Sequence, residues 1–265
     1  MSRHVVSALP AKKALGQHFL TDSFVIDRIM QAIAPNPGDA MVEIGPGRGA
    51  LTLPLLHNQH PLTAIELDRT LLPLLERSAK KIGTPLHLIH KNVLDVDFST
   101  LREGSPLRVI GNLPYNVSSP ILFHLLTFLS DIQDMHFMLQ KEVVERMAAS
   151  PGTKTYGRLS VMLQAQCQIH PLFTVEPESF TPAPKVFSSV VRLIPNPEAR
   201  AYVSDWRCFE TLVRAAFGQR RKTIRNALSS MCSPTDFAKA QIDPQQRAEA
   251  LSVHTFMTLS NIVSK

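Results

Sequence analysis

The chain has 265 residues, of which 44% are hydrophobic, 19% are charged and 6% are aromatic. This ordinary globular balance excludes a disordered, fibrous or membrane-embedded protein, and the length predicts one large domain with a small second one. Lys and Arg number 28 against 22 Asp and Glu, so the net charge is +6. Such a positive balance is compatible with a phosphate-rich partner.

The cysteines and the apolar stretches indicate a soluble protein of a reducing compartment. Cys167, Cys208 and Cys232 are odd in number and far apart, and they form no CxxC or His/Cys spacing. The N-terminal apolar stretch is broken by Pro10, and the run from Ile121 to Leu129 is too short to cross a bilayer. We therefore expect a cytoplasmic protein with no membrane partner and no metal.

Short apolar runs rich in β-branched residues alternate with helical patterns along the first two thirds of the chain. Strands are predicted at Ala40–Ile44, Leu62–Glu66, Leu86–Ile89, Arg108–Gly111, His136–Gln140, Cys167–His170 and Ser189–Leu193. Helical spacing lies between some of them, for example at Leu71, Leu72, Leu75 and Ala79. This alternation predicts an α/β fold, with a parallel sheet covered by helices on both faces.

The last third of the chain follows a different pattern. Six prolines between Pro171 and Pro197 mark loops and a boundary. Helices are predicted after them at Asp205–Phe217, Thr223–Ser229, Pro244–Ala250 and Ser252–Val263, with Asp243 as the N-cap before Pro244. Residues 196–265 hold ten Lys and Arg against six Asp and Glu. We expect an α/β domain over residues 1–195 and a basic, all-helical domain over residues 196–265.

A glycine-rich segment, Glu43-Ile-Gly-Pro-Gly-Arg-Gly49, follows the first predicted strand and precedes a helical pattern. Its glycines let the backbone turn tightly and approach a ligand, and amides at a helix start suit a carboxylate or a phosphate. Glu66 ends the next strand, where a carboxylate can accept hydrogen bonds from both hydroxyls of an adenosine ribose. The pair predicts an adenosine-containing cofactor. Its kind stays open, because Gly45, Gly47 and Ala50 also satisfy the loose dinucleotide pattern.

The tetrapeptide Asn112-Leu-Pro-Tyr115 stands at the end of the fourth predicted strand, the edge of a parallel sheet where ligands bind. The amine of an aromatic base is a poor nucleophile because its lone pair is delocalised. The Asn112 side-chain oxygen and a backbone carbonyl held by Pro114 would accept hydrogen bonds from this amine and direct its lone pair at an electrophilic methyl group. Tyr115 offers a ring for base stacking, worth about 1–3 kcal/mol per base. The segment therefore predicts methyl transfer to a base amine.

Five motifs resemble those of the ribosomal RNA adenine N6-dimethyltransferases and occur in the order typical of that family. They are Leu15-Gly-Gln-His-Phe-Leu20, the glycine-rich segment, Asn112-Leu-Pro-Tyr115, Phe180-Thr-Pro-Ala-Pro-Lys-Val186 and Phe217-Gly-Gln-Arg-Arg-Lys222. The pattern is most similar to the bacterial small-subunit enzymes associated with kasugamycin resistance, from about Lys12 onward. The resemblance implies a Rossmann-like, seven-stranded sheet with its last strand antiparallel, a small helical C-terminal domain, and S-adenosylmethionine as the cofactor.

The resemblance also implies a substrate. Four methyl groups are transferred from S-adenosylmethionine to two adjacent adenines in the 3′-terminal hairpin loop of 16S rRNA, in a partly assembled 30S subunit, by a monomeric enzyme. Two alternatives stay open: an enzyme that methylates 23S rRNA and confers macrolide resistance, and a ribosome-assembly factor without catalysis. A nicotinamide-dependent dehydrogenase is a weaker alternative, because it leaves Asn112–Tyr115 unexplained.

The resemblance assigns roles around the cofactor. The segment at His18 closes over it, the glycine loop takes the methionine end, Glu66 takes the ribose and Asn92 contacts the adenine amine. The expected cofactor-binding residues are Gln17, His18, Leu20, Gly45, Gly47, Glu66, Asn92 and Asn112. Asp95 and Asp97 are alternatives of lower rank for the adenine contact. Three positions depart from the family, which usually has Asp at Asn92, often has Asn at His18 and commonly has Asp at Phe187.

The expected residues at the target base are Asn112, Leu113, Pro114, Tyr115 and Phe180. In the family the ring at Phe180 forms the second wall of the base pocket, opposite Tyr115. Without the resemblance, a phenylalanine of the core is the default interpretation of that residue. No acid–base residue is expected, because a sulfonium methyl donor leaves as a neutral group and the product can lose its proton to water.

A basic surface is expected in the C-terminal domain, formed by Arg207, Arg214, Arg220, Arg221, Lys222 and Arg225. Four of these arginines, at offsets of 0, 7, 14 and 18, share one face if a single helix runs through them, and Gly218 is where such a helix can break. The surface would bind rRNA phosphates in a salt-sensitive manner. The alternative interpretation is a solvated helix face.

Overall fold

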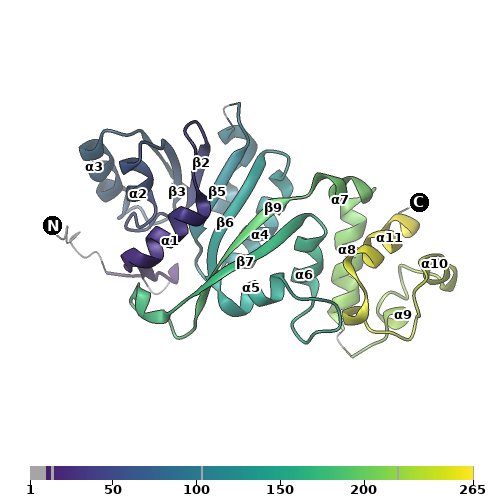
Figure 1. The fold of residues 1–265 in the computed structure, drawn as a ribbon. Helices are drawn as coiled ribbons and strands as arrows, with labels where there is room; N and C mark the ends of the chain where they lie inside the picture. The colour runs from purple at the N-terminus through teal and green to yellow at the C-terminus, as the bar shows by residue number, and fades with distance from the viewer. Residues whose placement is uncertain (1–9, 13–14, 103, 220, 265) are drawn as a thin grey trace. The chain divides into compact units, whose positions relative to one another are not determined.

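The computed structural model describes residues 10–12, 15–102, 104–219 and 221–264. These residues form two compact units (Figure 1). The first unit contains the chain up to Lys141 together with Pro171–Leu193, and the second contains Glu142–His170 and the chain from Ile194 onward. By packing, residues 142–170 therefore belong with the C-terminal helices. The division into a catalytic and an RNA-binding domain at residues 195 and 196 concerns function and stays a prediction.

A seven-stranded sheet lies mostly in the first unit. Its strands are β2 (Ala40–Ile44), β3 (Leu62–Glu66), β4 (Leu86–His90), β5 (Leu107–Asn112), β6 (Ile132–Gln140), β7 (Cys167–Val175) and β9 (Ser188–Pro195). Residues 167–170 of β7 and 194–195 of β9 belong to the second unit. They lie in the order β4-β3-β2-β5-β6-β9-β7. The pairs from β4 to β6 are parallel, and β9 pairs with β6 in the antiparallel direction. The predicted mostly parallel α/β sheet with an antiparallel last strand is confirmed, and the predicted strands are all present, some with longer bounds.

Helices and short turns connect these strands in the alternating pattern that parallel strands require. They are α1 (Ser23–Ile33), α2 (Thr52–His57), α3 (Leu72–Ile82), α4 (Ser118–Leu125) and 3₁₀ turns at Val93–Asp95, Phe98–Leu101, Leu126–Phe128 and Pro177–Ser179. Helix α2 packs against β3, α3 packs against β4, and the two helices contact each other (Figure 1). A separate antiparallel pair joins β1 (Phe19–Leu20) to β8 (Phe180–Thr181). This pair ties the N-terminal segment to the loop that precedes β9.

A close approach of β2 and β5 brings their carboxyl ends together. The two strands pair from Ala40 opposite Leu107 to Glu43 opposite Ile110. Gly111 follows directly, and a Cβ atom there would lie 2.5 Å from the carbonyl oxygen of Ile44. Only glycine fits such a backbone contact. Asn112, the next residue, consequently emerges beside the loop that follows β2.

Helices make up most of the second unit. They are α5 (Lys141–Met147, of which the first residue belongs to the first unit), α6 (Arg158–Gln164), α7 (Pro197–Tyr202), α8 (Trp206–Gly218), α9 (Ile224–Ala227), α10 (Pro234–Lys239) and α11 (Val253–Val263). The apolar faces of α8 and α11 supply its core, with Phe209, Leu212, Phe256 and Leu259 fully buried. The Tyr156 hydroxyl donates a hydrogen bond to the Leu251 carbonyl at 3.0 Å. The predicted helical character of this region is confirmed.

The prediction of a helix at Pro244–Ala250 is wrong. Only a 3₁₀ turn at Ala248–Ala250 forms there. The Gln246 carbonyl accepts a hydrogen bond from the Ile224 amide at 2.7 Å, and the Pro244 carbonyl accepts one from the Arg225 amide at 3.3 Å. These carbonyls satisfy the first amides of α9 instead of continuing a helix of their own. Among the described helices, none combines the length and the apolar character needed to span a membrane.

Candidate active site

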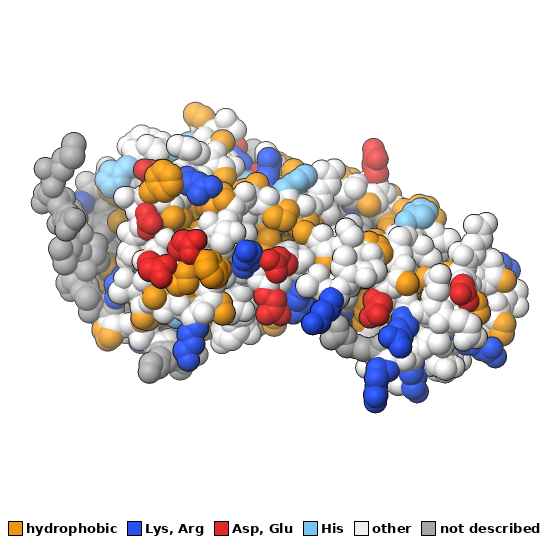
Figure 2. All heavy atoms as spheres, turned by 60° about the horizontal axis from the view of Figure 1, so that its bottom comes forward, with side chains coloured by type: hydrophobic (Ala, Val, Ile, Leu, Met, Phe, Trp, Pro, Cys, Tyr) orange, Lys and Arg blue, Asp and Glu red, His pale blue; other side chains and the backbone are white. Residues whose placement is uncertain are grey.

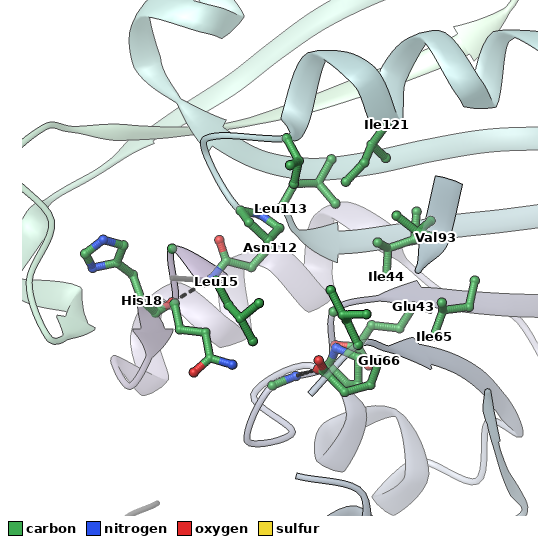
Figure 3. Close-up of a pocket in the computed structure, with 18 of the residues that line it drawn as sticks. Leu15, His18, Glu43, Ile44, Ile65, Glu66, Val93, Asn112, Leu113 and Ile121 are labelled. Atoms are coloured by element: carbon green, nitrogen blue, oxygen red, sulfur yellow. Dashed lines mark hydrogen bonds between the residues drawn. The ribbon is translucent and has the colours of Figure 1, made fainter. Parts of the chain in front are cut away.

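A pocket of about 310 Å³ opens at the carboxyl ends of β2, β3 and β5, within the first unit (Figure 3). This volume lies in the range of small-molecule sites. Five short segments line it: residues 15–20, 43–48, 65–67, 91–94 and 112–117, together with Ala50, Leu51 and Ile121. Apolar side chains such as Ile44, Ile65, Val93 and Leu113 cover much of the wall, and a few polar groups point into it. The location agrees with the rule for ligand sites in open parallel sheets.

The glycine loop forms one side of this pocket. Gly45 and Gly47 have φ angles of 67° and 57°, in the left-handed region that favours glycine. The Gly45 amide donates to the Ile65 carbonyl at 2.9 Å, which fixes the loop to the end of β3. A Cβ atom at Gly47 would lie 3.2 Å from the ring of Phe19. The loop therefore needs glycine both for its backbone angles and for its fit under the N-terminal segment.

Glu66 is held by backbone amides on both sides. Its Oε2 accepts a hydrogen bond from the Gly47 amide at 3.1 Å (Figure 3), and its Oε1 accepts one from the Asp68 amide at 2.8 Å. Burial raises the pKa of this carboxyl, although these amides oppose the shift and favour the charged form. The carboxyl group is thus pre-oriented at the pocket, where sequence spacing expected it.

Asp68 was not among the expected residues, yet it ties the N-terminal segment to the pocket. Its buried carboxylate accepts hydrogen bonds from Lys12 Nζ at 2.6 Å and from Gln17 Nε2 at 2.9 Å. The Thr70 amide and hydroxyl donate two more, at 3.0 and 2.7 Å. Burial alone would raise the pKa of Asp68, but the hydrogen bonds from Lys12, Thr70 and Gln17 outweigh it and hold the pKa far below its usual value. The only sequence signal was its place two residues after Glu66.

Asn112 is oriented by the same N-terminal segment. Its Nδ2 donates a hydrogen bond to the backbone carbonyl of His18 at 3.1 Å, the second dashed contact in Figure 3. Because the amide nitrogen is engaged there, the Oδ1 atom is the group left to accept a hydrogen bond from a ligand. The orientation is the one that the proposed contact with a base amine requires. Gln17, His18 and Leu20 all line the pocket, as do Leu113 and Pro114.

Tyr115 forms a half-buried aromatic wall at the pocket. Its hydroxyl lies 2.7 Å from the Oγ of Ser188, and its ring stacks on His18 with centroids 5.6 Å apart and planes 22° apart. The Nδ1 of His18 lies in turn 2.8 Å from the Pro182 carbonyl. Burial raises the pKa of the Tyr115 hydroxyl, so it stays neutral at physiological pH. The ring is therefore held in place by Ser188 on its hydroxyl and by His18 on its face.

Phe180 does not line the pocket. Its side chain is 3% exposed and packs in a hydrophobic cluster with Leu20, Val25, Ile29 and Val190. It pairs with Leu20 across the β1–β8 ribbon. In this arrangement it supports the segment that carries His18 and is not brought together with Tyr115. Its expected role as the second wall of a base pocket stays a prediction.

Asn92 lines the pocket from the turn after β4. Its Oδ1 accepts a hydrogen bond from the Leu94 amide at 3.1 Å, which makes it the N-cap of a 3₁₀ turn. With the oxygen used in this way, the amide presents N–H groups as its remaining polar atoms. The lower-ranked alternatives Asp95 and Asp97 are absent from the described pocket lining, and Asp97 caps the following turn through the Ser99 amide at 3.0 Å.

Glu43 is a second carboxyl group of the pocket that sequence reasoning did not single out as a site residue. It is 2% exposed, and its Oε2 accepts a hydrogen bond from the Thr52 hydroxyl at 2.6 Å. Burial raises its pKa to about 8, and the nearby Glu66 adds to the shift against the opposing hydrogen bond from Thr52. Its position before the first glycine of the loop was the available signal. The pocket thus holds two buried carboxyl groups of different environment.

The expected basic residues of the second unit lie on two helices and the turn between them. Helix α8 ends at Gly218, so a single helix does not carry Arg207, Arg214, Arg221 and Arg225 together. The first two stand on α8, Arg221 and Lys222 lie in the turn, and Arg225 is on α9; all five side chains are exposed. Arg220 lies outside the described residues. Figure 2 shows several Lys and Arg side chains on the surface of this unit, interrupted by few acidic ones.

Within the described parts of the chain, no group of three His, Cys, Asp or Glu side chains is arranged to hold a metal ion. The three cysteines are reduced, and two of them, Cys167 and Cys232, are buried. Burial raises the pKa of the Cys167 thiol to about 12 and that of the Cys232 thiol to about 11, which keeps both unreactive.

Comparisons with known proteins agree on one family. A family model described as ribosomal RNA adenine dimethylase matches residues 8–265. The ribosomal RNA small subunit methyltransferase A of Xanthomonas oryzae pv. oryzae is 57% identical over 253 residues, which cover 96% of each chain. The proteins of that name from Xanthomonas axonopodis pv. citri and Xanthomonas campestris pv. campestris are 57% and 56% identical over the same shares.

Solved structures share the fold. A dimethyladenosine transferase from Plasmodium falciparum has a TM-score of 0.80 and 24% identity, with 91% of this chain and 96% of that chain covered. The 23S rRNA methyltransferase ErmE has a TM-score of 0.67 and 21% identity, with 93% and 100% covered. At these identities the likeness concerns the fold alone, and both folds extend over nearly the full length of this chain.

Proposed function

Because the chain belongs to the ribosomal RNA adenine dimethylase family, we propose that it dimethylates two adjacent adenines in the 3′-terminal hairpin loop of 16S rRNA, at their N6 amines. The chain is an rRNA adenine methyltransferase by family, and the small-subunit name of its 57% identical relatives supports this substrate. The observation that carries the chemistry is the fixed orientation of Asn112 at the end of β5, beside the ring of Tyr115.

The pocket fits S-adenosylmethionine as the methyl donor. Glu66 presents a buried carboxylate to a ribose, held by the Gly47 and Asp68 amides. The glycine loop brings backbone close to the carboxylate end of such a ligand, while Ile44, Ile65 and Val93 offer an apolar surface for its flat base. When bound, this group supplies an electrophilic methyl on a sulfonium, whose loss leaves a neutral thioether.

The residues of the chain bind and orient the target amine. The Asn112 Oδ1 accepts a hydrogen bond from the amine, because its Nδ2 is held by the His18 carbonyl at 3.1 Å. This contact draws the nitrogen lone pair out of conjugation with the ring and toward the methyl group. Tyr115 stacks on the target base and fixes its plane, with its hydroxyl anchored to Ser188 at 2.7 Å. Preorganisation of this kind lowers the barrier without a general base.

The exposed arginines of α8, α9 and the turn between them would bind rRNA phosphates. Hairpin-loop bases suit such an enzyme, since unpaired bases can leave the stack and enter a pocket at low cost. The shared fold of ErmE is compatible with the 23S alternative, but the 57% identical relatives bear a small-subunit name. A partly assembled 30S subunit is the proposed form of the substrate.

The test is transfer of labelled methyl groups from S-adenosylmethionine to small subunits that lack these modifications, with the products mapped by mass spectrometry. Dimethyladenine at two adjacent loop positions is the expected result. Asn112→Ala should lower the rate at least 100-fold, since removal of one preorganised hydrogen bond costs on that order, while Asn58→Ala, an exposed residue outside the pocket, should not.

Three other outcomes would overturn parts of the proposal. Methylation confined to 23S rRNA would favour the macrolide-resistance alternative. Tight binding of the subunit without transfer would favour an assembly factor. An unchanged rate in Asn112→Ala would refute the role given to that side chain.

A further inference from the structure

An exposed apolar and cationic patch borders the pocket and has no place in the function described so far. It consists of Lys141, Lys185, Val186 and Phe187, and we call it the rim patch. Phe187 is 46% exposed and Val186 is 42% exposed, whereas Ser188, the next residue, is fully buried. The two lysines are also exposed. Of the nine phenylalanines in the first unit, Phe24 and Phe187 are the two that are exposed.

Strand register brings the rim patch next to the target-base wall. Asn112 at the end of β5 stands opposite Met138 of β6. Two residues further, β6 ends at Gln140, which stands opposite Ser188 of β9. The Oγ of Ser188 lies 2.7 Å from the Tyr115 hydroxyl. Phe187 therefore precedes, by one residue, the side chain that anchors the catalytic ring.

The backbone also fixes Lys141 to Phe187. The Lys141 amide donates a hydrogen bond to the Phe187 carbonyl at 2.9 Å. The Lys141 ammonium lies 5.9 Å from the centroid of the Phe187 ring, within the range of a cation–π contact. An exposed ring is thus accompanied by a positive charge at a fixed place. Lys141 and Phe187 stay beside Ser188 as long as β6 and β9 remain hydrogen-bonded to each other.

We propose that Phe187 stacks on a nucleobase that flanks the target adenine, while Lys141 and Lys185 contact the adjoining phosphates. An exposed ring with nearby lysines is the combination that binds single-stranded nucleic acid, in which rings stack on bases and cations follow the backbone. This inference rests on the proposed function, since a base held against Tyr115 remains joined to its neighbours. The patch adjoins Ser188, the partner of Tyr115, and is therefore within reach of those neighbours.

The test compares Phe187→Ala with Phe187→Tyr, which keeps a stacking ring, and with Phe24→Ala. Phe24 is 68% exposed on α1 and stands outside the pocket, so it controls for the loss of any exposed phenylalanine. The probes are small subunits that lack the methyl groups and a synthetic RNA hairpin with two adjacent loop adenines. The hairpin carries 2-aminopurine in turn at each position that flanks them, and stacking on a ring quenches its fluorescence.

Phe187→Ala should weaken the binding of both RNA probes about 5- to 20-fold, at the lower end of the range for one stacked base. It should leave kcat within about twofold and the Kd for S-adenosylmethionine unchanged. The wild-type chain and Phe187→Tyr should quench one flanking 2-aminopurine, and Phe187→Ala should not. Phe24→Ala should match the wild type in every measurement.

The opposite results separate this inference from the proposed function. If the wild-type chain methylates the subunit and Phe187→Ala binds the hairpin as tightly as the wild type, the stacking role is wrong and the function stands. A loss of binding to the subunit but not to the hairpin would assign the rim patch to a ribosomal protein and overturn the inference. No dimethyladenine with the wild-type chain would remove the proposed function itself.

Discussion

Replacing Asp68 by asparagine tests how the N-terminal segment is held over the cofactor pocket. The substitution keeps the shape of the side chain but removes its charge and replaces one of its two oxygens by an NH₂ donor. Asp68 accepts hydrogen bonds from Lys12, Gln17 and Thr70, all between 2.6 and 3.0 Å. In the variant, the contacts to the Lys12 ammonium and the Gln17 amide cannot both persist.

The size of the effect follows from these two contacts. A hydrogen bond to a buried charged group contributes about 1.5–3 kcal/mol. The Lys12 side chain is 44% exposed, so solvent screening reduces its share to about 1 kcal/mol. Loss of the acceptor for Gln17 adds roughly the same amount. Together these contacts favour the observed position of residues 15–20 over a detached one by about 2 kcal/mol, a factor of about 30 in the equilibrium between the two.

Because residues 15–20 line the pocket, the Kd of S-adenosylmethionine should rise about 10- to 30-fold in Asp68→Asn. Isothermal titration calorimetry measures this, and hydrogen exchange of the amides in residues 15–20 should accelerate in parallel. Asp205→Asn is a matched control, since Asp205 caps α8 through the Arg207 amide at 2.8 Å and asparagine caps helices equally well. Unchanged affinity together with unchanged exchange in Asp68→Asn would refute the reasoning.

Three further predictions concern the pocket and the basic surface. Asn92→Asp should lower the Kd of S-adenosylmethionine about 3- to 10-fold in calorimetry, because the Leu94 amide occupies the Asn92 oxygen and a carboxylate would offer a second acceptor to an adenine amine; equal or weaker affinity would contradict it. The pKa of Glu43 is raised to about 8 from an ordinary 4.5, so the folded state gains stability from its proton at low pH and loses it as pH rises through this window. Glu43→Gln should remove that loss of unfolding free energy, which is a few kcal/mol at most. If urea unfolding gives the same pH dependence from pH 5 to 8 for the wild type and the variant, the idea is wrong. The double variant Arg221→Ala/Lys222→Ala should reduce the slope of log K against log salt for subunit binding by about 1 to 2, whereas an unchanged slope would mean that these side chains contact no phosphate.

Much of the fold is predictable from sequence because it depends on local patterns. The strands of the parallel sheet are short apolar runs with clear ends, and their alternation with helices predicts parallel pairing. The helix predicted at Pro244–Ala250 failed for a non-local reason, since carbonyls of that segment accept hydrogen bonds from the first amides of α9. Helix α8 ends at Gly218, where the sequence marked a break, so the condition under which the four arginines would share one helix face is not met.

The same distinction between local and non-local signals applies to the site residues. The glycine loop, Glu66 and Asn112 were expected because Glu66 and Asn112 end strands, and the loop follows a strand, whose carboxyl ends face the pocket. Asp68 was not predicted, because its partners Lys12 and Gln17 are 56 and 51 residues away along the chain. The burial of Phe180 depends on the pairing of β1 with β8, which no periodicity in two-residue strands reveals.

The contact between Asn112 and residue 18 has a consequence for how this site tolerates change. The Asn112 amide is oriented by the His18 carbonyl, an atom that every amino acid supplies. The side chain at that position is therefore released from the task and stacks on Tyr115 instead. The histidine at this position therefore leaves the orientation of Asn112 intact. A different side chain at this position would keep the backbone contact to Asn112 and change only the ring that faces Tyr115.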